Sequence, residues 1–339
     1  MKLGIIKSFK DIDPLIDSYQ KACDYCGVEY IVLDLLEDNW IDNIRKADVD
    51  GVLVREKGNI QEYKSMYDER LWVINKYLKI PIYPSWHELF LYENKRMYAY
   101  FLQSHNIKHP ATHIFYDKKR ALDFCDKIQY PIVFKTNGGA SGSGVRVISN
   151  KNKAKTYVKN CFGRIDARLA FGNILWGKYA GIIPVPKIGM SQRHFVIMQE
   201  FVNIDTEWRI IRIGKTYAGY KRPTECGYAS CELMEYGFPP IELLKLIKKI
   251  SDDEKIDSLS LDVLVSKDQQ YYVTEMQSLY GSFSLKQCVV KGVSGRIVFR
   301  NNEFIFEKGS DFFIHNSNVL RVKDFIDKLK TNYYSNQNQ

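Results

Sequence analysis

Apolar residues near the start of the chain form short runs, separated by polar segments with helical spacing. The runs Leu3–Ile6, Tyr30–Leu35 and Gly51–Val54 are predicted strands. Asp13-Pro14 opens a helix between the first two, because aspartate caps helices and proline suits the first helical position. A longer helix is predicted over Gln61–Lys79. Strands that alternate with helices in this way predict a parallel sheet with crossover helices.

The middle of the chain alternates helices and strands around a glycine-rich segment. Helices are predicted at Asn94–His105, at Lys118–Ile128 and around residues 150–160, and strands at His113–Tyr116, Pro131–Lys135 and Val145–Ile148. Residues 161–194 follow no clean period. Two interpretations of them stay open: a surface helix followed by a loop, or a substrate-facing insertion.

From Phe195 onward the chain is rich in predicted strands. These are Phe195–Met198, Trp208–Ile213, Thr216–Lys221, Leu259–Val265, Tyr271–Met276, Arg296–Phe299 and Glu303–Phe306, with helices at Ile241–Ile250 and near Val322–Lys330. The fold class predicted is therefore α/β, with α+β character in the C-terminal half. Four regions are expected: a parallel-sheet domain (1–88), a subdomain with the glycine-rich loop and an insertion near 161–194 (89–194), a C-terminal subdomain (195–332) and a frayed tail (333–339).

Composition limits the class of protein. Of the 339 residues, 45% are hydrophobic and 26% charged, which is typical of a globular protein with ordinary cores. No apolar run is long enough for a membrane helix, and the first residues lack the pattern of a signal peptide, so we expect a cytoplasmic protein. The seven cysteines, including Cys23 and Cys26 in one C-x-x-C, are interpreted as reduced thiols rather than a disulfide framework.

The net charge of +9 indicates an anionic partner. Nucleic acid is one candidate and a small anionic substrate is the other. Because basic residues are spread along the chain and are not gathered in one arm, we favour the small anion.

The glycine-rich segment Gly138–Gly144 is a candidate phosphate-binding loop. Its four glycines and two serines leave backbone N–H groups able to surround phosphate oxygens. It lacks the G-K-[ST] ending of a Walker A loop and the third glycine of a dinucleotide fingerprint. Lys135, at the end of the preceding strand, and Lys95 are candidate phosphate-binding cations. A merely flexible turn is the alternative.

Three oxygen-bearing side chains come late in the chain. Asp262 lies in an apolar strand, where an unpaired carboxylate is costly. Glu275 and Gln277 are two residues apart on the next predicted strand and so share a face. A hairpin could bring the three together, and such oxygen ligands suit magnesium. A solvated polar face of a sheet is the alternative.

The order of these motifs resembles the ATP-grasp superfamily, in particular its amino-acid-ligase-like and ribosomal-modification-ligase-like members. That order is a helix lysine, a strand lysine, the glycine-rich hairpin, the Gln199-Glu200-Phe201 hinge, basic strands with Arg209 and Arg222, then Asp262 and Glu275-Met276-Gln277. The resemblance covers about residues 90–290. It implies a parallel-sheet domain ahead of two subdomains that clasp ATP.

The resemblance also implies roles for single residues. ATP binding would fall to Lys95, Lys135, Ser141, Gly142, Ser143, Gly144, Gln199, Glu200, Val202 and Glu207. Arg209 and Arg222 would be catalytic, and Asp262, Glu275 and Gln277 would ligate magnesium, with two ions expected. The family usually has asparagine where Gln277 stands, which puts the geometry of the second ion in doubt.

The implied activity is a carboxylate–amine ligase that works through an acyl phosphate and acts on small molecules. A phosphotransferase acting on a hydroxyl group and a non-catalytic nucleic-acid-binding protein are the alternatives. The basic residues of 162–193, Arg168 and Arg193 first, are expected to bind an acidic acceptor such as an amino acid, a peptide or a sugar acid. The oligomeric state is left open, with a homodimer as one option.

Overall fold

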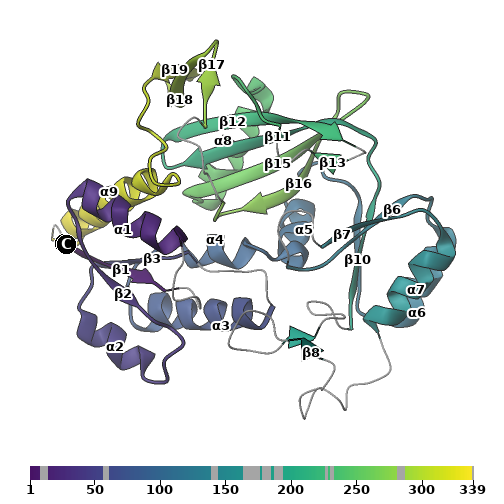
Figure 1. Cartoon of the computed structure of the whole chain (residues 1–339), viewed down its shortest axis with the longest axis horizontal. Coiled ribbons are helices and arrows are strands. Elements are labelled where there is room, and N and C mark those ends of the chain that lie inside the picture. The colour runs from purple at the N-terminus through teal and green to yellow at the C-terminus, as the bar shows by residue number, and fades with distance from the viewer. Residues whose placement is uncertain are drawn as a thin grey trace. The chain divides into compact units, whose positions relative to one another are not determined.

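The computed structural model describes most of the chain (Figure 1). The described residues are 1–7, 14–55, 61–138, 144–162, 176–177, 185–186, 194–225, 228–229, 233–280 and 287–337. They fall into two compact units: unit 1 is Met1–Lys57, Ser65–Tyr92 and Ile204–Gln339, and unit 2 is Gly58–Lys64 and Glu93–Asn203. The division into four regions stays a prediction. The contacts within the chain place its first and last segments together in unit 1.

A parallel four-stranded sheet lies at the start of unit 1, as predicted. Its order is β2-β1-β3-β4, with β1 (Lys2–Ile6), β2 (Glu29–Leu33), β3 (Gly51–Leu53) and β4 (Ile82–Tyr83). The connecting helices are α1 (Pro14–Cys26), α2 (Trp40–Ala47) and α3 (Gln61–Trp72). Because β2 and β3 lie on opposite sides of β1, the strand order reverses between β1 and β3. Ligands of open α/β sheets bind at the carboxyl ends of strands at such a point.

The predicted helix Gln61–Lys79 is wrong in its second half. The α-helix ends at Trp72, and a π-helical turn, Val73–Tyr77, follows it. The wider turn changes which positions face inward, and Ile74 within it is fully buried.

The C-terminal helix α9 (Asn318–Gln337) completes the core of this first sheet. It packs beside α1, as Figure 1 shows in yellow and purple. Val322 and Phe325 of α9 share one buried cluster with Leu3 of β1 and Tyr19 of α1. The predicted helix Val322–Lys330 lies inside α9, which begins earlier and ends later.

The larger sheet of unit 1 is antiparallel. Its main path is β16-β15-β11-β12-β18-β17, with β16 (Tyr271–Gln277), β15 (Ser258–Ser266), β11 (Ile204–Ile213), β12 (Thr216–Glu225), β18 (Val293–Arg300) and β17 (Val289–Val290). Strands β13 (Tyr228–Ala229) and β14 (Glu235–Tyr236) pair with β12, and β19 (Glu303–Lys308) pairs with β18. Helix α8 (Ile241–Glu254) packs on β11 and β15.

A short helix that the sequence reading missed, α4 (Trp86–Leu91), follows β4. Ser85 and Glu88 form a capping box at its start. The buried Glu88 carboxylate also accepts hydrogen bonds from the backbone N–H groups of Asp257 and Ser258, at 2.9 and 2.6 Å. One side chain thus fixes the start of α4 to the start of β15.

Unit 2 contains an antiparallel sheet in the order β5-β10-β6-β7. Its elements are β5 (Thr112–Phe115), β10 (Val196–Glu200), β6 (Ile132–Lys135), β7 (Val145–Ile148), α5 (Lys95–Ser104), α6 (Lys118–Lys127), α7 (Lys151–Cys161) and the short pair β8 (Trp176–Gly177) and β9 (Val185–Pro186). A buried cluster that includes Cys125, Phe134 and Met198 joins the sheet to α6 and α7. The predicted fold class, α/β with α+β character in the C-terminal half, is confirmed.

The segment 161–194 and any membrane-spanning helix can be compared with the structure only within the described residues. Most of the segment 161–194 lies outside them, including Arg164, Arg168, Lys178, Lys187 and Arg193, so its role in binding an acceptor stays a prediction. None of the described helices is both long enough and apolar enough to cross a membrane.

Candidate functional site

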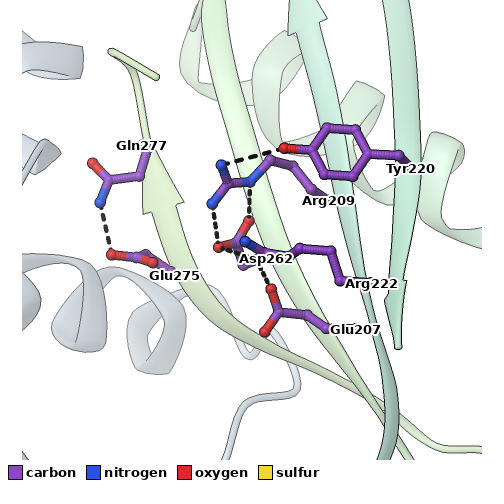
Figure 2. A network of polar contacts seen from close by, with 7 residues as sticks. All are labelled: Glu207, Arg209, Tyr220, Arg222, Asp262, Glu275 and Gln277. Carbon is purple, nitrogen blue, oxygen red and sulfur yellow. Dashed lines mark hydrogen bonds and ion pairs between the residues drawn. The ribbon is translucent and has the colours of Figure 1, made fainter. Parts of the chain in front are cut away.

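A row of polar and charged side chains crosses the large sheet of unit 1 at one level. Arg209 on β11 lies directly opposite Tyr220 on β12 and Asp262 on β15. Asp262 in turn lies opposite Glu275 on β16. Directly opposite residues of antiparallel strands point to the same face, so the register places the four side chains on one side of the sheet, as Figure 2 shows.

Asp262 is the centre of this row. Nε and Nη2 of Arg209 donate to its two carboxylate oxygens at 2.6 and 2.7 Å, and Nη2 of Arg222 donates to Oδ2 at 2.9 Å. Arg222 also forms an ion pair with Glu207, which lies across from it on β11. We define Glu207, Arg209, Tyr220, Arg222, Asp262, Glu275 and Gln277 as the polar network (Figure 2).

Burial strengthens the interactions between the charges of the polar network. Asp262 is only 4% exposed. Burial acts to raise the pKa of Asp262, but Arg209 and Arg222 outweigh it and hold the pKa at about 2. Burial acts to lower the pKa of Arg209, and Asp262 raises it above its usual value. Both groups are therefore fixed as ions at neutral pH.

Tyr220 is the member of the network that sequence reading missed. Nη1 of Arg209 donates to its hydroxyl oxygen at 3.5 Å, and its ring meets Tyr236 edge-on. The available signal was the alternation of β12, which puts Tyr220 and Arg222 on one face.

Glu275 and Gln277 form the edge of the network. Nε2 of Gln277 donates to Oε1 of Glu275 at 2.7 Å. The amide oxygen of Gln277 is buried and has no hydrogen-bond partner in the described part of the chain, so an acceptor is available there. Within the described residues, no three His, Cys, Asp or Glu side chains are grouped closely enough to hold a metal ion. The amide oxygen of Gln277 and the carboxylates of Asp262 and Glu275 are hard oxygen ligands of the kind that suit magnesium.

Unit 2 carries the other predicted residues. Lys95 begins α5 and is nearly fully buried, with Nζ 3.9 Å from Oε2 of Glu93. The first backbone N–H groups of α5 are bound by one residue: the carbonyl oxygen of Asn137 accepts from Lys95 N, and its side-chain oxygen accepts from Arg96 N, both at 3.0 Å. Asn137 directly precedes Gly138, so the glycine-rich segment starts beside the N-terminus of α5, the helix that carries Lys95.

The remaining candidates lie on β6 and β10 or beside them. Lys135 ends β6 and lies across from Ile197 of β10. Gln199 is buried and donates from Nε2 to the hydroxyl of Thr112 at 2.8 Å, whereas Glu200 is exposed and Val202 half-buried. Ser141, Gly142 and Ser143 lie outside the described residues. The structure therefore groups the unit 1 residues into one network and leaves the nucleotide-binding roles of the unit 2 residues as predictions.

Gly144, the last residue of the glycine-rich segment, has no room for a side chain. A Cβ there would come 1.8 Å from the hydroxyl oxygen of Thr136, which donates to the carbonyl oxygen of Gly138. We expect Gly144→Ala to lower the free energy of unfolding by about 1–3 kcal/mol through overpacking, measured by urea denaturation. Gly237→Ala is the matched control, because a Cβ at Gly237 meets nothing within 4 Å. Equal effects of the two substitutions would contradict the close contact.

Comparison with known proteins agrees with this architecture. A sequence model of the ATP-grasp (A) domain of phosphoribosylglycinamide synthetase matches residues 93–178. The alpha-aminoadipate–LysW ligase LysX of Saccharolobus solfataricus is 28% identical over 193 residues, which are 55% of this chain and 62% of the relative. The chain thus matches less than two thirds of the length of that relative.

Solved structures are similar over more of the chain. D-alanine–D-alanine ligase from Bacillus anthracis has a TM-score of 0.57 at 15% identity, covering 98% of this chain and 99% of that one. A RimK domain ATP-grasp protein from Sphaerobacter thermophilus has a TM-score of 0.55 at 14% identity, covering 81% and 90%. The resemblance predicted from the order of motifs is therefore confirmed, and the chain has the ATP-grasp fold.

Proposed function

We propose that this chain is an ATP-dependent ligase that joins a carboxylate to an amine through an acyl phosphate, releasing ADP and phosphate. The observation that carries the proposal is the polar network: two arginines and three carboxylates on one face of a sheet, in an ATP-grasp fold. A buried row of this kind is expensive for a protein whose only need is stability, because buried ions lose their hydration. Its three carboxylates outnumber its two arginines, which suits a bound cation, and the arginines can supply positive charge to a transferring phosphoryl group.

The roles expected from the family resemblance are part of this proposal. Lys95, Lys135 and the glycine-rich loop would bind the phosphates of ATP, and Gln199, Glu200, Val202 and Glu207 its adenosine part. Asp262, Glu275 and Gln277 would hold magnesium, which would neutralise phosphate charge when bound. The orphaned amide oxygen of Gln277 supports that part of the proposal.

The chemistry needs no protein nucleophile. An oxygen of the substrate carboxylate attacks the γ-phosphorus, the bond from that phosphorus to the bridging oxygen breaks, and ADP leaves. The amine nitrogen then attacks the carbonyl carbon, phosphate leaves with the electron pair of the C–O bond, and the nitrogen loses a proton. Arg209 and Arg222 would supply positive charge to the phosphoryl oxygens.

Relatives support an amino acid among the substrates. One relative is by name an alpha-aminoadipate–LysW ligase and one structural neighbour a D-alanine–D-alanine ligase. The small anionic partner that the charge of +9 favours is consistent with such a substrate.

Phosphate release tests the proposal. We expect the chain, given ATP, Mg²⁺ and a panel of amino acids, to release phosphate in proportion to an amide product identified by mass spectrometry. With hydroxylamine in place of the amine, a hydroxamate should form from the acyl phosphate. A phosphorylated product that persists without any amine would instead identify a phosphotransferase. Absence of ATP consumption with every carboxylate would contradict ligase activity.

A further inference from the structure

Arg321 is a buried cation of unit 1 that lies outside the polar network. Arg321, in the first turn of α9, is 0% exposed. Its Nε donates to Oγ of Ser258 at 3.3 Å, and its Nη1 donates to the carbonyl oxygen of Asn316 and to Oδ1 of Asn318, both at 3.1 Å. Its guanidinium lies over the ring of Tyr280 at 4.7 Å. These contacts fix the guanidinium in place but leave Nη2 without a partner among the described residues.

The side chains around Arg321 have further unused donors. The hydroxyls of Tyr19 and Tyr280 and the amide nitrogen of Asn318 are buried and have no hydrogen-bond partner in the described ranges. Burial raises the pKa of both tyrosines, and the charges of Arg321 and Arg55 oppose that rise, so the two hydroxyls lie in the field of the two guanidiniums. Every unused group in this set can donate, a pattern that calls for an acceptor and not for another donor.

No carboxylate in the described part of the chain forms an ion pair with Arg321. A buried cation without a counter-ion is costly. The nearby buried carboxylate, Glu88, is bound to the backbone N–H groups of Asp257 and Ser258, and burial raises its pKa to about 7. Glu88 is therefore only partly ionised at neutral pH. It does not accept a hydrogen bond from Nη2 of Arg321.

The position in the fold is one where ligands bind. Arg55 follows the carboxyl end of β3, at the point where the strand order reverses between β1 and β3. It is 5% exposed, and its Nη1 donates to the carbonyl oxygen of Tyr280 at 3.1 Å. The charge of Arg209 also lowers the pKa of Tyr280, against the larger effect of burial, so the cluster is electrostatically coupled to the polar network.

We propose that Arg321, Tyr19, Tyr280 and Asn318 form a subsite that binds the α-carboxylate of an amino-acid substrate, with Arg55 adding positive charge. The inference rests on the proposed function, which requires carboxylate-bearing substrates. Four unused donors match the four lone-pair sites of a carboxylate. This carboxylate is held for recognition, and no bond to it changes in the subsite.

Binding without ATP tests the subsite. The full chain is titrated calorimetrically with glycine, L-alanine, L-glutamate and L-lysine, and with the corresponding α-amides, which lack the carboxylate. We expect at least one amino acid to bind and its amide to bind at least 10-fold more weakly. Tyr19→Phe and Tyr280→Phe each remove one hydroxyl with little change of shape. Each should weaken the binding of that amino acid by about 10-fold. Neither should change the affinity for ADP.

Tyr217→Phe is the matched control, because Tyr217 is a buried tyrosine of unit 1 on β12, packed against Phe304. It should bind the amino acid as the wild type does. Equal binding of acids and amides, no binding by any amino acid of the panel, or wild-type affinity in both tyrosine variants would overturn the subsite. Because no ATP is present, carboxylate-dependent binding in a chain without ligase activity would refute the proposed function and leave the subsite standing.

Discussion

The Glu275→Gln variant is expected to lose nearly all turnover while it keeps its fold. Glu275 lies opposite Asp262 and accepts a hydrogen bond from Gln277, so it is the carboxylate between the two other proposed magnesium ligands. Glutamine keeps the size of the side chain and removes its charge. If the stabilisation of transition-state charge falls by several kcal/mol, the rate falls by about 100-fold or more. Phosphate release at saturating ATP and Mg²⁺ measures the effect.

A matched substitution separates this effect from a general one. Glu307, on β19 of the same sheet, accepts from Nε of Arg296 at 2.8 Å and lies outside the polar network. Glu307→Gln should keep turnover within about twofold of the wild type, since an exposed or half-exposed ion pair contributes little. Near-normal phosphate release by Glu275→Gln, with circular dichroism unchanged in both variants, would remove Glu275 from the reaction.

Strands were predictable from sequence where apolar residues recur along them. β6, β7, β15 and β16 lie within one or two residues of their predicted ranges, because apolar residues dominate them. β11 begins at Ile204 and not at Trp208, because the polar residues at its start resemble a loop. Their pairing across the sheet, Glu207 with Arg222 above all, explains why they belong to a strand.

The predicted ends of helices were wrong where polar residues are buried by contacts distant in sequence. α9 begins at Asn318, and the buried Asn318 and Arg321 of its first turn resemble exposed residues in sequence. Their burial depends on Tyr280 and Ser258, which are distant in the chain. α4, in contrast, carried a local signal, the Ser85-x-x-Glu88 capping box, that sequence reading passed over.

Partners within the site were the least predictable feature. Sequence reasoning placed Arg209, Arg222 and Asp262 in one site but gave them separate roles, the arginines with phosphate and the aspartate with metal. The structure pairs them directly. This pairing depends on the register between β11 and β15. From one sequence, register can be predicted only where a short turn joins the two strands.

The Asp262→Asn variant is expected to lower the free energy of unfolding by about 3–5 kcal/mol. The substitution keeps the shape of the side chain but leaves the half-buried Arg209 and Arg222 with no shared counter-charge on β15. Because the pKa of Asp262 is held at about 2 in the fold, below its value in an unfolded chain, its contribution is present in full above pH ~4. It is lost as the pH falls towards 2, so urea denaturation at pH 7 measures the whole effect.

Asp252 provides the control for that measurement, because it makes a similar bond at the surface. Nη1 of Arg212 donates to Oδ1 of Asp252 at 2.6 Å, yet the Asp252 side chain is 41% exposed, against 5% for Asp262. Water solvates the exposed Asp252 carboxylate, and Arg212 keeps its hydrogen bonds to the carbonyl oxygens of Gly214 and Lys248. Asp252→Asn should therefore cost less than about 1 kcal/mol. Similar losses in the two variants would show that burial does not set the strength of the Asp262 pairs. The argument that the buried polar network exists for catalysis would then lose its main physical support.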